Sequence, residues 1–356
     1  MTVDPHERLL ADFAAGRKAA LARAISIVEN HRPGFERLLA ALNAKLGHAR
    51  RIGITGPPGA GKSTLTTSLA RAYRAQGLTV GIVAVDPTSV FTGGALLGDR
   101  IRMEEIALDS GVYIRSLATR GSLGGLSSAT REACDVLDAF GTDRILIDTV
   151  GVGQSELDVA RSADTCLVVL VPESGDSIQT LKAGVMEIAD VFTVNKADRP
   201  GADRLRNEIE IMLGMRAGAT MKNVPAHHGV DLSRGNLLRQ VREAAQSDDA
   251  EQWTPPVLKT VAAKDEGIAE LVEALERHFH YLERSGTLRE RRRARLRERV
   301  VEVAEDRMRR RLWTDADTNE WLDARLPALE SGEATPFAVA DALLARSADL
   351  LTRTTT

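Results

Sequence analysis

Seven short apolar runs separated by helical stretches constrain the fold of this chain more than any other sequence feature. The runs are mainly apolar and lack a two-residue alternation of apolar and polar residues, as is typical of strands in a parallel sheet covered on both faces. Amphipathic spacing fills most of the gaps, for example at 62–76 and 125–140. The sequence therefore predicts an α/β fold with a doubly wound, mostly parallel sheet. The predicted strands are 51–55, 80–85, 112–117, 144–148, 166–171, 191–195 and 257–262.

Helical segments are expected at both ends of this sheet region. The N-terminal segment 9–47 predicts two amphipathic helices separated at Pro33-Gly34, and a long charged helix is expected after Gly286. Near the C-terminus, Thr335 and Pro336 have the residue types of an N-cap and a first helical position. The segment 214–255, which contains His227 and His228, is predicted to be a loop excursion of unassigned role. We expect three parts: a helical extension at 1–47, a sheet domain at 48–285 and a helical region at 286–356.

Composition narrows the class of protein. The chain has 356 residues, of which 43% are hydrophobic and 27% charged, with a formal net charge of -3, as in globular proteins. No run approaches the roughly 18 apolar residues of a membrane span, and the start lacks an apolar signal core, so we expect a cytoplasmic protein without membrane contact. Cys134 and Cys166 cannot form a disulfide framework and lack metal-binding spacing.

The strongest local motif is GPPGAGKST, which follows the first predicted strand and opens a helix. This is the form of a phosphate-binding loop, whose glycines let backbone N–H groups converge on a phosphate. Lys62 is expected to reach the β- and γ-phosphates, and the Ser63 hydroxyl to bind Mg²⁺. The expected nucleotide-binding residues here are Gly56, Pro57, Pro58, Gly59, Ala60, Gly61, Lys62, Ser63 and Thr64.

Two acidic residues stand at the ends of predicted strands. Asp86 comes at the end of 80–85, and Asp148 ends 144–148. The carboxyl ends of parallel strands face one crevice, so both carboxylates are expected to contribute to a Mg²⁺ site beside the phosphates. Asp148 also begins a DxxG motif in which the Gly151 N–H can sense the γ-phosphate. Val152 stands where some nucleotide switches carry a water-orienting glutamine, so weak intrinsic hydrolysis is expected.

A base-recognition motif, NKAD, follows another predicted strand. The Asp198 carboxylate can accept hydrogen bonds from both N1–H and the 2-amino group of guanine, a pair that adenine cannot donate. Asn195 is expected to brace the loop, and Lys196 to lie over the ring. Ala263, in the later TVAAK segment, is either a backbone donor to guanine O6 or an ordinary residue at a strand end. GTP and GDP are the expected nucleotides.

Together, the motifs GPPGAGKST, VAVDPTS, LGDRIRM, DTVGVGQSE, VPESGDSIQTLKAGVMEIAD and NKAD resemble the methylmalonyl-CoA mutase-associated GTPases. This MeaB/ArgK-like family includes the human methylmalonic aciduria type A protein. The resemblance implies a P-loop GTPase of the signal-recognition-particle-like class. It further implies a homodimer that acts as a chaperone for an adenosylcobalamin-dependent acyl-CoA mutase, gating cofactor loading and protecting the mutase.

The resemblance also implies roles that the residues alone do not. Asp99 becomes a candidate Mg²⁺ ligand, and Lys182 the notable cation of an additional switch loop beginning at Val171. Many family members carry Glu where this chain has Asp148, which can shift the metal contact or route it through water. No side chain is an obvious base for the attacking water, so catalysis is expected to depend on charge stabilisation and positioning.

Three rival functions remain open at the level of sequence. A metal-delivery GTPase would expose Cys or His clusters, and an ArgK-type kinase of transport proteins would use ATP and an acceptor protein. A nucleic-acid-binding protein would use the arginine-rich stretch 284–311. That stretch has acids interleaved at helical spacing and no aromatic residue within 289–311, so a dimer or partner surface is the expected use.

Overall fold

The computed structural model of the chain describes residues 4–86, 103–118, 128–149, 159, 161–172, 186–216, 238–239, 241–243 and 252–347. Two compact units are present, Met1–Leu288 and Arg289–Thr356. Among the described helices, none combines the length and apolar character needed to cross a bilayer.

A sheet of seven strands forms the centre of the first unit. The strands are β1 (Arg50–Thr55), β2 (Val80–Asp86), β3 (Val112–Ala118), β4 (Arg144–Thr149), β5 (Thr165–Leu170), β6 (Val191–Asn195) and β7 (Val257–Thr260). They are ordered β3-β2-β4-β1-β5-β6-β7, and every neighbouring pair is parallel, which confirms the predicted sheet. The order reverses direction beside β1, and ligands of such sheets bind at the carboxyl ends of the strands near that point.

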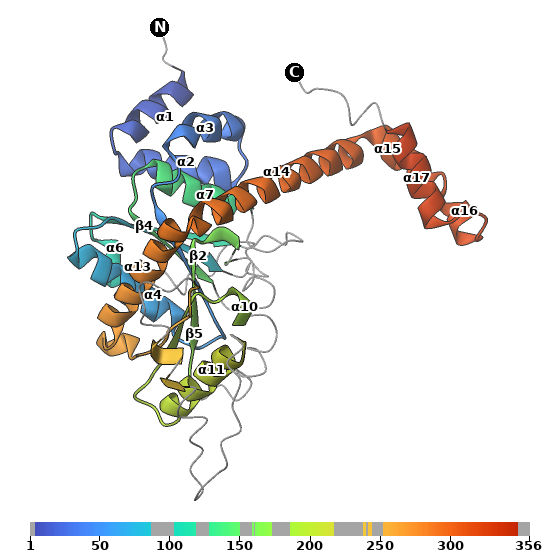
Figure 1. Ribbon diagram of the computed structural model, residues 1–356. Coiled ribbons are helices and arrows are strands. Elements are labelled where there is room, and N and C mark those ends of the chain that lie inside the picture. The colour runs from blue at the N-terminus through green and yellow to red at the C-terminus, as the bar shows by residue number, and fades with distance from the viewer. Residues whose placement is uncertain are drawn as a thin grey trace, which may run out of the picture. The chain divides into compact units, whose positions relative to one another are not determined.

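Helices cover both faces of the sheet (Figure 1). The helices of the first unit are α1 (Pro5–Ala14), α2 (Lys18–Glu29), α3 (Phe35–Leu42), α4 (Lys62–Ala75), α6 (Glu104–Ala107), α7 (Ser128–Ala139), α10 (Met186–Ile188), α11 (Ala202–Arg216) and α13 (Ile268–Ser285). Leu146 and Val169 pack in one core layer with α4 and α13, whereas Ile147 packs in the opposite layer with α2, α3 and α7. Phe192 packs with α11. Both faces are therefore buried, which explains the continuous apolar runs.

The N-terminal extension differs from its prediction. The sequence predicts one helix before Pro33-Gly34, but the structure has two, because α1 ends at Ala14 and α2 begins at Lys18. Between them Gly16 has a φ of +73°, a left-handed conformation that interrupts a helix and that glycine adopts at little cost. The expected break at Pro33-Gly34 is confirmed, since Gly34 precedes α3 with a φ of +87°.

A buried polar cluster joins this extension to the sheet. The Asp138 carboxylate, on α7, accepts hydrogen bonds of 2.9–3.0 Å from three successive backbone N–H groups at 47–49. Arg51 of β1 donates to Asp138 at 3.2 Å and to Asp135 at 2.9 Å. Burial alone would lower the pKa of Arg51, but the two carboxylates raise it above its usual value, so the guanidinium stays charged. The chain therefore enters β1 along a fixed path.

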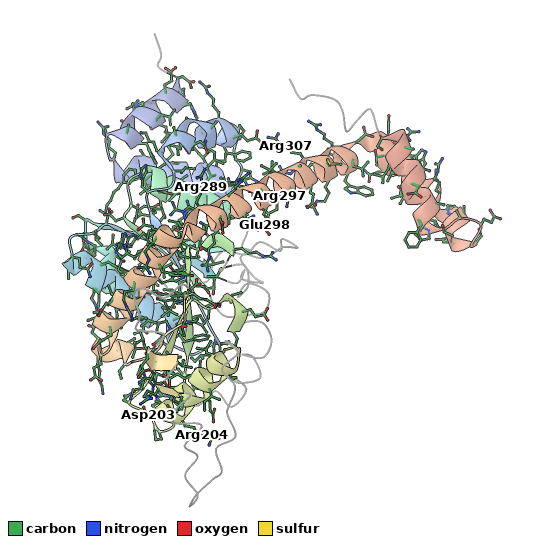
Figure 2. All side chains as sticks on the ribbon, viewed as in Figure 1. Asp203, Arg204, Arg289, Arg297, Glu298 and Arg307 are labelled. Atoms are coloured by element: carbon green, nitrogen blue, oxygen red, sulfur yellow. The ribbon has the colours of Figure 1, made fainter. Side chains whose placement is uncertain are left out.

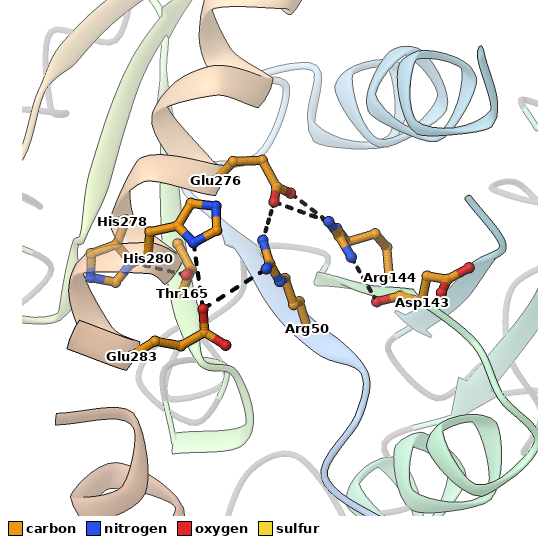
Figure 3. Close-up of polar contacts among 8 residues, drawn as sticks. All are labelled: Arg50, Asp143, Arg144, Thr165, Glu276, His278, His280 and Glu283. Carbon is orange, nitrogen blue, oxygen red and sulfur yellow. Dashed lines mark hydrogen bonds and ion pairs between the residues drawn. The ribbon is translucent and has the colours of Figure 1, made fainter. Parts of the chain in front are cut away.

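A second polar cluster fastens α13 to the amino ends of the central strands (Figure 3). Arg50 and Arg144 are register partners at the starts of β1 and β4, and both pair with Glu276 of α13. The Arg144 guanidinium also lies over the ring of Tyr73, 5.3 Å from its centroid. Burial, together with the nearby Glu276 carboxylate, raises the pKa of Tyr73 well above its usual value. This cluster lies at the end of the sheet opposite the phosphate loop.

The second unit is helical. Its elements are α14 (Thr287–Thr314), which begins in the first unit, α15 (Ala316–Asp323), α16 (Leu326–Glu330) and α17 (Pro336–Arg346). Thr335 caps α17 by accepting a 3.2 Å hydrogen bond from the Ala338 N–H, and Pro336 is the first helical residue, as predicted. Val339 and Leu343 are buried where α17 packs with α15.

The long charged helix is confirmed as α14, and none of its side chains is buried within the described chain. Charged side chains project along its length, including Arg289, Arg297, Glu298 and Arg307 (Figure 2). Large apolar side chains are exposed on the same helix: Leu296, Val300, Val301, Val303, Met308 and Trp313. Apolar and charged side chains are thus interleaved along this helix.

The Asp138 cluster generates a stability prediction. Asp138→Ala leaves three backbone N–H groups without their acceptor and Arg51 with a single carboxylate, so we expect the free energy of unfolding in urea to fall by about 3 kcal/mol. Asp12→Ala is the control, because the described ion pair of Asp12 is with the exposed Arg17, and its loss should change the value by less than about 0.5 kcal/mol. Equal losses in the two variants would contradict the anchoring role of Asp138.

Candidate functional site

The loop between β1 and α4 has the shape of a phosphate-binding loop, and two glycines enforce it. Gly56 has a φ of +136°, and a Cβ there would lie 2.0 Å from the backbone oxygen of Val169 on β5. Gly61 has a φ of +85°, and a Cβ there would lie 2.6 Å from Nδ2 of Asn195. Any side chain at either position would therefore collide with a neighbouring element, which is why the GxxxxGK[ST] pattern needs glycine at both ends.

Lys62 is the first residue of α4 and is buried against this loop. Its Nζ donates to the backbone oxygens of Gly56 at 2.7 Å and Pro57 at 3.1 Å. The ammonium thus lies over the loop that it follows in sequence, next to the N-terminus of α4, where the positive end of the helix dipole favours an anion. Ser63 is partly exposed and Thr64 exposed in the same turn. Within the loop, Pro58 and Gly59 are exposed and Ala60 is buried.

The predicted acidic residues end strands on the same side of the sheet. In the strand register Asp148 lies between Ile54 of β1 and Ala84 of β2, and its side chain is buried. Asp86 is the last residue of β2. Carboxylate and hydroxyl oxygens are the donors that Mg²⁺ prefers. Among the described residues, no group of three or more His, Cys, Asp or Glu is placed to hold a metal ion.

Asn195, at the end of β6, joins the two predicted halves of the nucleotide site. Its Nδ2 donates to the backbone oxygen of Ala60 at 2.9 Å. Its Oδ1 accepts from the Ala262 N–H at 3.1 Å and from the Thr260 hydroxyl at 3.2 Å. Lys196 Nζ donates to the backbone oxygen of Gly59 at 2.8 Å. The NKAD segment is therefore bonded directly to the phosphate loop.

The segment 261–266, which we call the base loop, follows β7. It was predicted as strand to residue 262, but β7 ends at Thr260 and a 3-10 turn covers Ala262–Lys264. The strand ends early because the Ala262 N–H bonds to Asn195 instead of a sheet neighbour. Ala263, the predicted guanine donor, is exposed in this turn, and that role stays a prediction.

Several supporting side chains were missed by the sequence reasoning. Ser68 of α4 donates to the Ala262 backbone oxygen at 2.9 Å, and the Thr193 and Thr260 hydroxyls lie 3.0 Å apart beneath Asn195. Lys264 Nζ lies 3.6 Å from Asp198 Oδ2, beside the predicted guanine acceptor. A hydroxyl within a helix or strand does not stand out in a sequence, so Ser68, Thr193 and Thr260 could not be singled out. Lys264 could have been, because it follows the TVAA segment already linked to base recognition.

Other predicted positions are not covered. Asp99, Gly151 and Lys182 lie outside the described residues, as do His227 and His228. The side chain of Asp86 is likewise outside the description, although its backbone is part of β2. The phosphate loop, Asp148, Asn195 and the base loop are the predicted parts that the structure brings together.

Comparisons with known proteins agree with this geometry. The family model described as methylmalonyl Co-A mutase-associated GTPase MeaB matches residues 21–317. A protein of Pyrococcus abyssi named as a GTPase is 45% identical over 297 residues, covering 83% of each chain. The mitochondrial methylmalonic aciduria type A homolog of Mus musculus is 32% identical, covering 95% of this chain and 78% of its own.

Among solved structures, the crystal structure of an LAO/AO transport system kinase superposes with a TM-score of 0.67 at 25% identity, over 96% of this chain and 97% of its own. The family match and the named relatives agree with the phosphate loop built by Gly56, Gly61 and Lys62. This chain is a nucleotide-binding P-loop GTPase and belongs to the family of methylmalonyl Co-A mutase-associated GTPases.

Proposed function

We propose that this GTPase is a Mg²⁺-dependent timing switch and chaperone for an adenosylcobalamin-dependent acyl-CoA mutase of the methylmalonyl-CoA type. GTP hydrolysis would be coupled to loading and protection of the mutase cofactor. The observation that carries the proposal is the match of residues 21–317 to a mutase-associated GTPase family. The name of the mouse relative, a methylmalonic aciduria type A homolog, supports it.

The phosphate end of the site supplies charge and position. Lys62 and the N–H groups at the start of α4 bind the β- and γ-phosphates and stabilise the negative charge that develops during transfer. The Ser63 hydroxyl and the carboxylates of Asp86 and Asp148 would hold Mg²⁺, with Asp99 as a further ligand. The ion, when bound, neutralises charge on the phosphate oxygens. Gly151 and Lys182 complete the proposed switch regions.

The base end supplies selectivity. Asp198 accepts the paired N–H donors of guanine, while Asn195 holds the segment against the phosphate loop through Ala60. The Lys196 stem lies over the ring, and the Ala263 N–H reads guanine O6. Since Lys196 also bonds to Gly59, the base and phosphate contacts share one backbone framework.

A homodimer is part of the same proposal. The exposed apolar side chains along α14, among them Leu296, Val300 and Trp313, support it, because arginines and acids interleaved with them can pair across a helical contact. Neither a membrane nor a nucleic acid is a proposed partner, and the proposed location is the cytoplasm.

Asp198→Asn tests the base site. The amide loses one acceptor and places a donor against the guanine amino group, so GDP affinity should fall by at least about a hundredfold. Xanthine has a carbonyl in place of that amino group, so xanthosine diphosphate should bind the variant better than GDP does. Isothermal titration calorimetry with GDP and with xanthosine diphosphate measures this change in nucleotide preference.

Asp203→Asn is the matched control for that experiment. It is the same substitution at an exposed carboxylate nearby on α11, whose pKa is lowered by its 2.8 Å hydrogen bond from Lys259. GDP affinity should be unchanged in this variant. Retention of GDP preference in Asp198→Asn would show that another group reads the base.

The coupling to a mutase predicts a rate effect. Adding a saturating adenosylcobalamin-dependent mutase from the same organism should raise the GTP hydrolysis rate by about tenfold or more, since an arranged switch supplies the positioning that the isolated chain lacks. Release of inorganic phosphate measures the rate. The control is an acyl-CoA enzyme that does not use adenosylcobalamin, and equal rates with and without the mutase would overturn the coupling.

An ArgK-type kinase of transport proteins is the second candidate, favoured by the structural similarity to the LAO/AO transport system kinase. It would transfer the γ-phosphate to a protein and would use ATP. Incubation with γ-labelled ATP or GTP and a periplasmic binding protein separates the two functions. Label in protein would support the kinase, whereas label only in inorganic phosphate, from GTP alone, would support the switch.

A further inference from the structure

The base loop holds a strained backbone that needs support. Val261 and Glu266 form an isolated antiparallel bridge, with the Val261 N–H donating to the Glu266 backbone oxygen at 3.0 Å. Between them, Asp265 has a φ of +57°, a left-handed conformation that costs a non-glycine residue free energy. The exposed tip at Ala263 keeps its place only if the residues around it are held.

Arg71 of α4 provides such a hold. Its Nη2 donates to Asp265 Oδ1 at 2.9 Å and to the Ser68 hydroxyl at 3.3 Å. Its Nη1 donates to Glu105 Oε2 of α6 at 2.9 Å. Each exposed ion pair is weak alone, but the planar guanidinium fixes three acceptors in one geometry. The base loop and α6 are thus tied to the helix that begins at the phosphate loop.

The hydrogen bonds continue from Arg71 to the phosphate loop through buried groups. The Ser68 hydroxyl, which accepts from Arg71, donates to the Ala262 backbone oxygen. The Ala262 N–H donates to Asn195, and Asn195 donates to the Ala60 backbone oxygen. Loss of the Arg71 contacts would therefore loosen, through this series of hydrogen bonds, the residues that surround the proposed guanine pocket.

We propose that Arg71 is a positioning residue for guanine nucleotides: through Asp265 and Ser68 it holds the base loop closed, and it thereby sets how long GDP stays bound. The inference rests on the proposed guanine site.

The test compares Arg71→Ala and Asp265→Asn with wild type. Asparagine tolerates the left-handed conformation, so Asp265→Asn removes the carboxylate charge without straining the turn. Displacement of a fluorescent GDP analogue by excess GDP should be about three- to fivefold faster in both variants. The double variant should be no faster than Arg71→Ala, because both substitutions remove the same interaction.

Steady-state kinetics distinguish positioning from a general structural defect. The KM for GTP should rise by about three- to fivefold while kcat is unchanged, because Arg71 contributes to binding alone. Arg71→Lys, which keeps the charge but not the planar fork, should recover part of the wild-type KM. The urea midpoint of unfolding of nucleotide-free Arg71→Ala should match that of the control variant Lys259→Ala.

Lys259→Ala is the matched control. It breaks an ion pair of similar exposure, with Asp203 at 2.8 Å, on the strand that leads into the base loop, yet it touches no residue of that loop within the described contacts. Wild-type GDP release in this variant supports the inference. Unchanged release in Arg71→Ala, equal acceleration in Lys259→Ala, or a fall in kcat at constant KM would overturn it. A wild-type chain that binds ADP as tightly as GDP would instead overturn the guanine site itself.

Discussion

The nucleotide site depends on one buried carboxamide. Asn195 is 2% exposed, and it bonds to Ala60 with its amino group and to Ala262 with its oxygen. A carboxamide donates from its nitrogen and accepts at its oxygen, and leaving either backbone partner unpaired in a dry interior is costly. The phosphate loop and the base loop come from segments far apart in sequence. Their distance from each other is therefore fixed by this side chain.

The opposite end of the sheet supplies the rigidity that this arrangement needs. Glu276 pairs with Arg50 and Arg144, so α13 is held against the amino ends of β1 and β4. The base loop leads directly into α13, with Gly267 between them at a φ of +75°. The helix that follows the base loop is therefore held against the amino ends of two central strands. The Asp138 cluster, the Glu276 cluster and the Asn195 carboxamide thus stabilise three different parts of the same domain.

Much of the architecture was predictable because burial on both faces leaves a plain sequence signal. All seven strands and the cap at Thr335 were predicted from residue type and spacing, and so were the residues of the phosphate loop. The break at Gly16 was missed because apolar spacing continues across it, and only the backbone conformation reveals the turn. Ser68 and Arg71 were missed for another reason. On a helix, a serine and an arginine are unremarkable until tertiary contacts bring Ala262 and Asp265 beside them.

The shared core of the N-terminal extension has a consequence for how the chain is made. Leu9, Phe13 and Leu21 pack in one cluster with Val136 of α7. A ribosome finishes the extension long before it reaches α7, and at roughly 5–20 residues per second the wait is on the order of ten seconds. During that interval α1–α3 can pack on one another, but the part of their apolar surface that packs on α7 is uncovered. The extension therefore completes its core only after α7 has been synthesised, so its folding is coupled to that of the sheet domain.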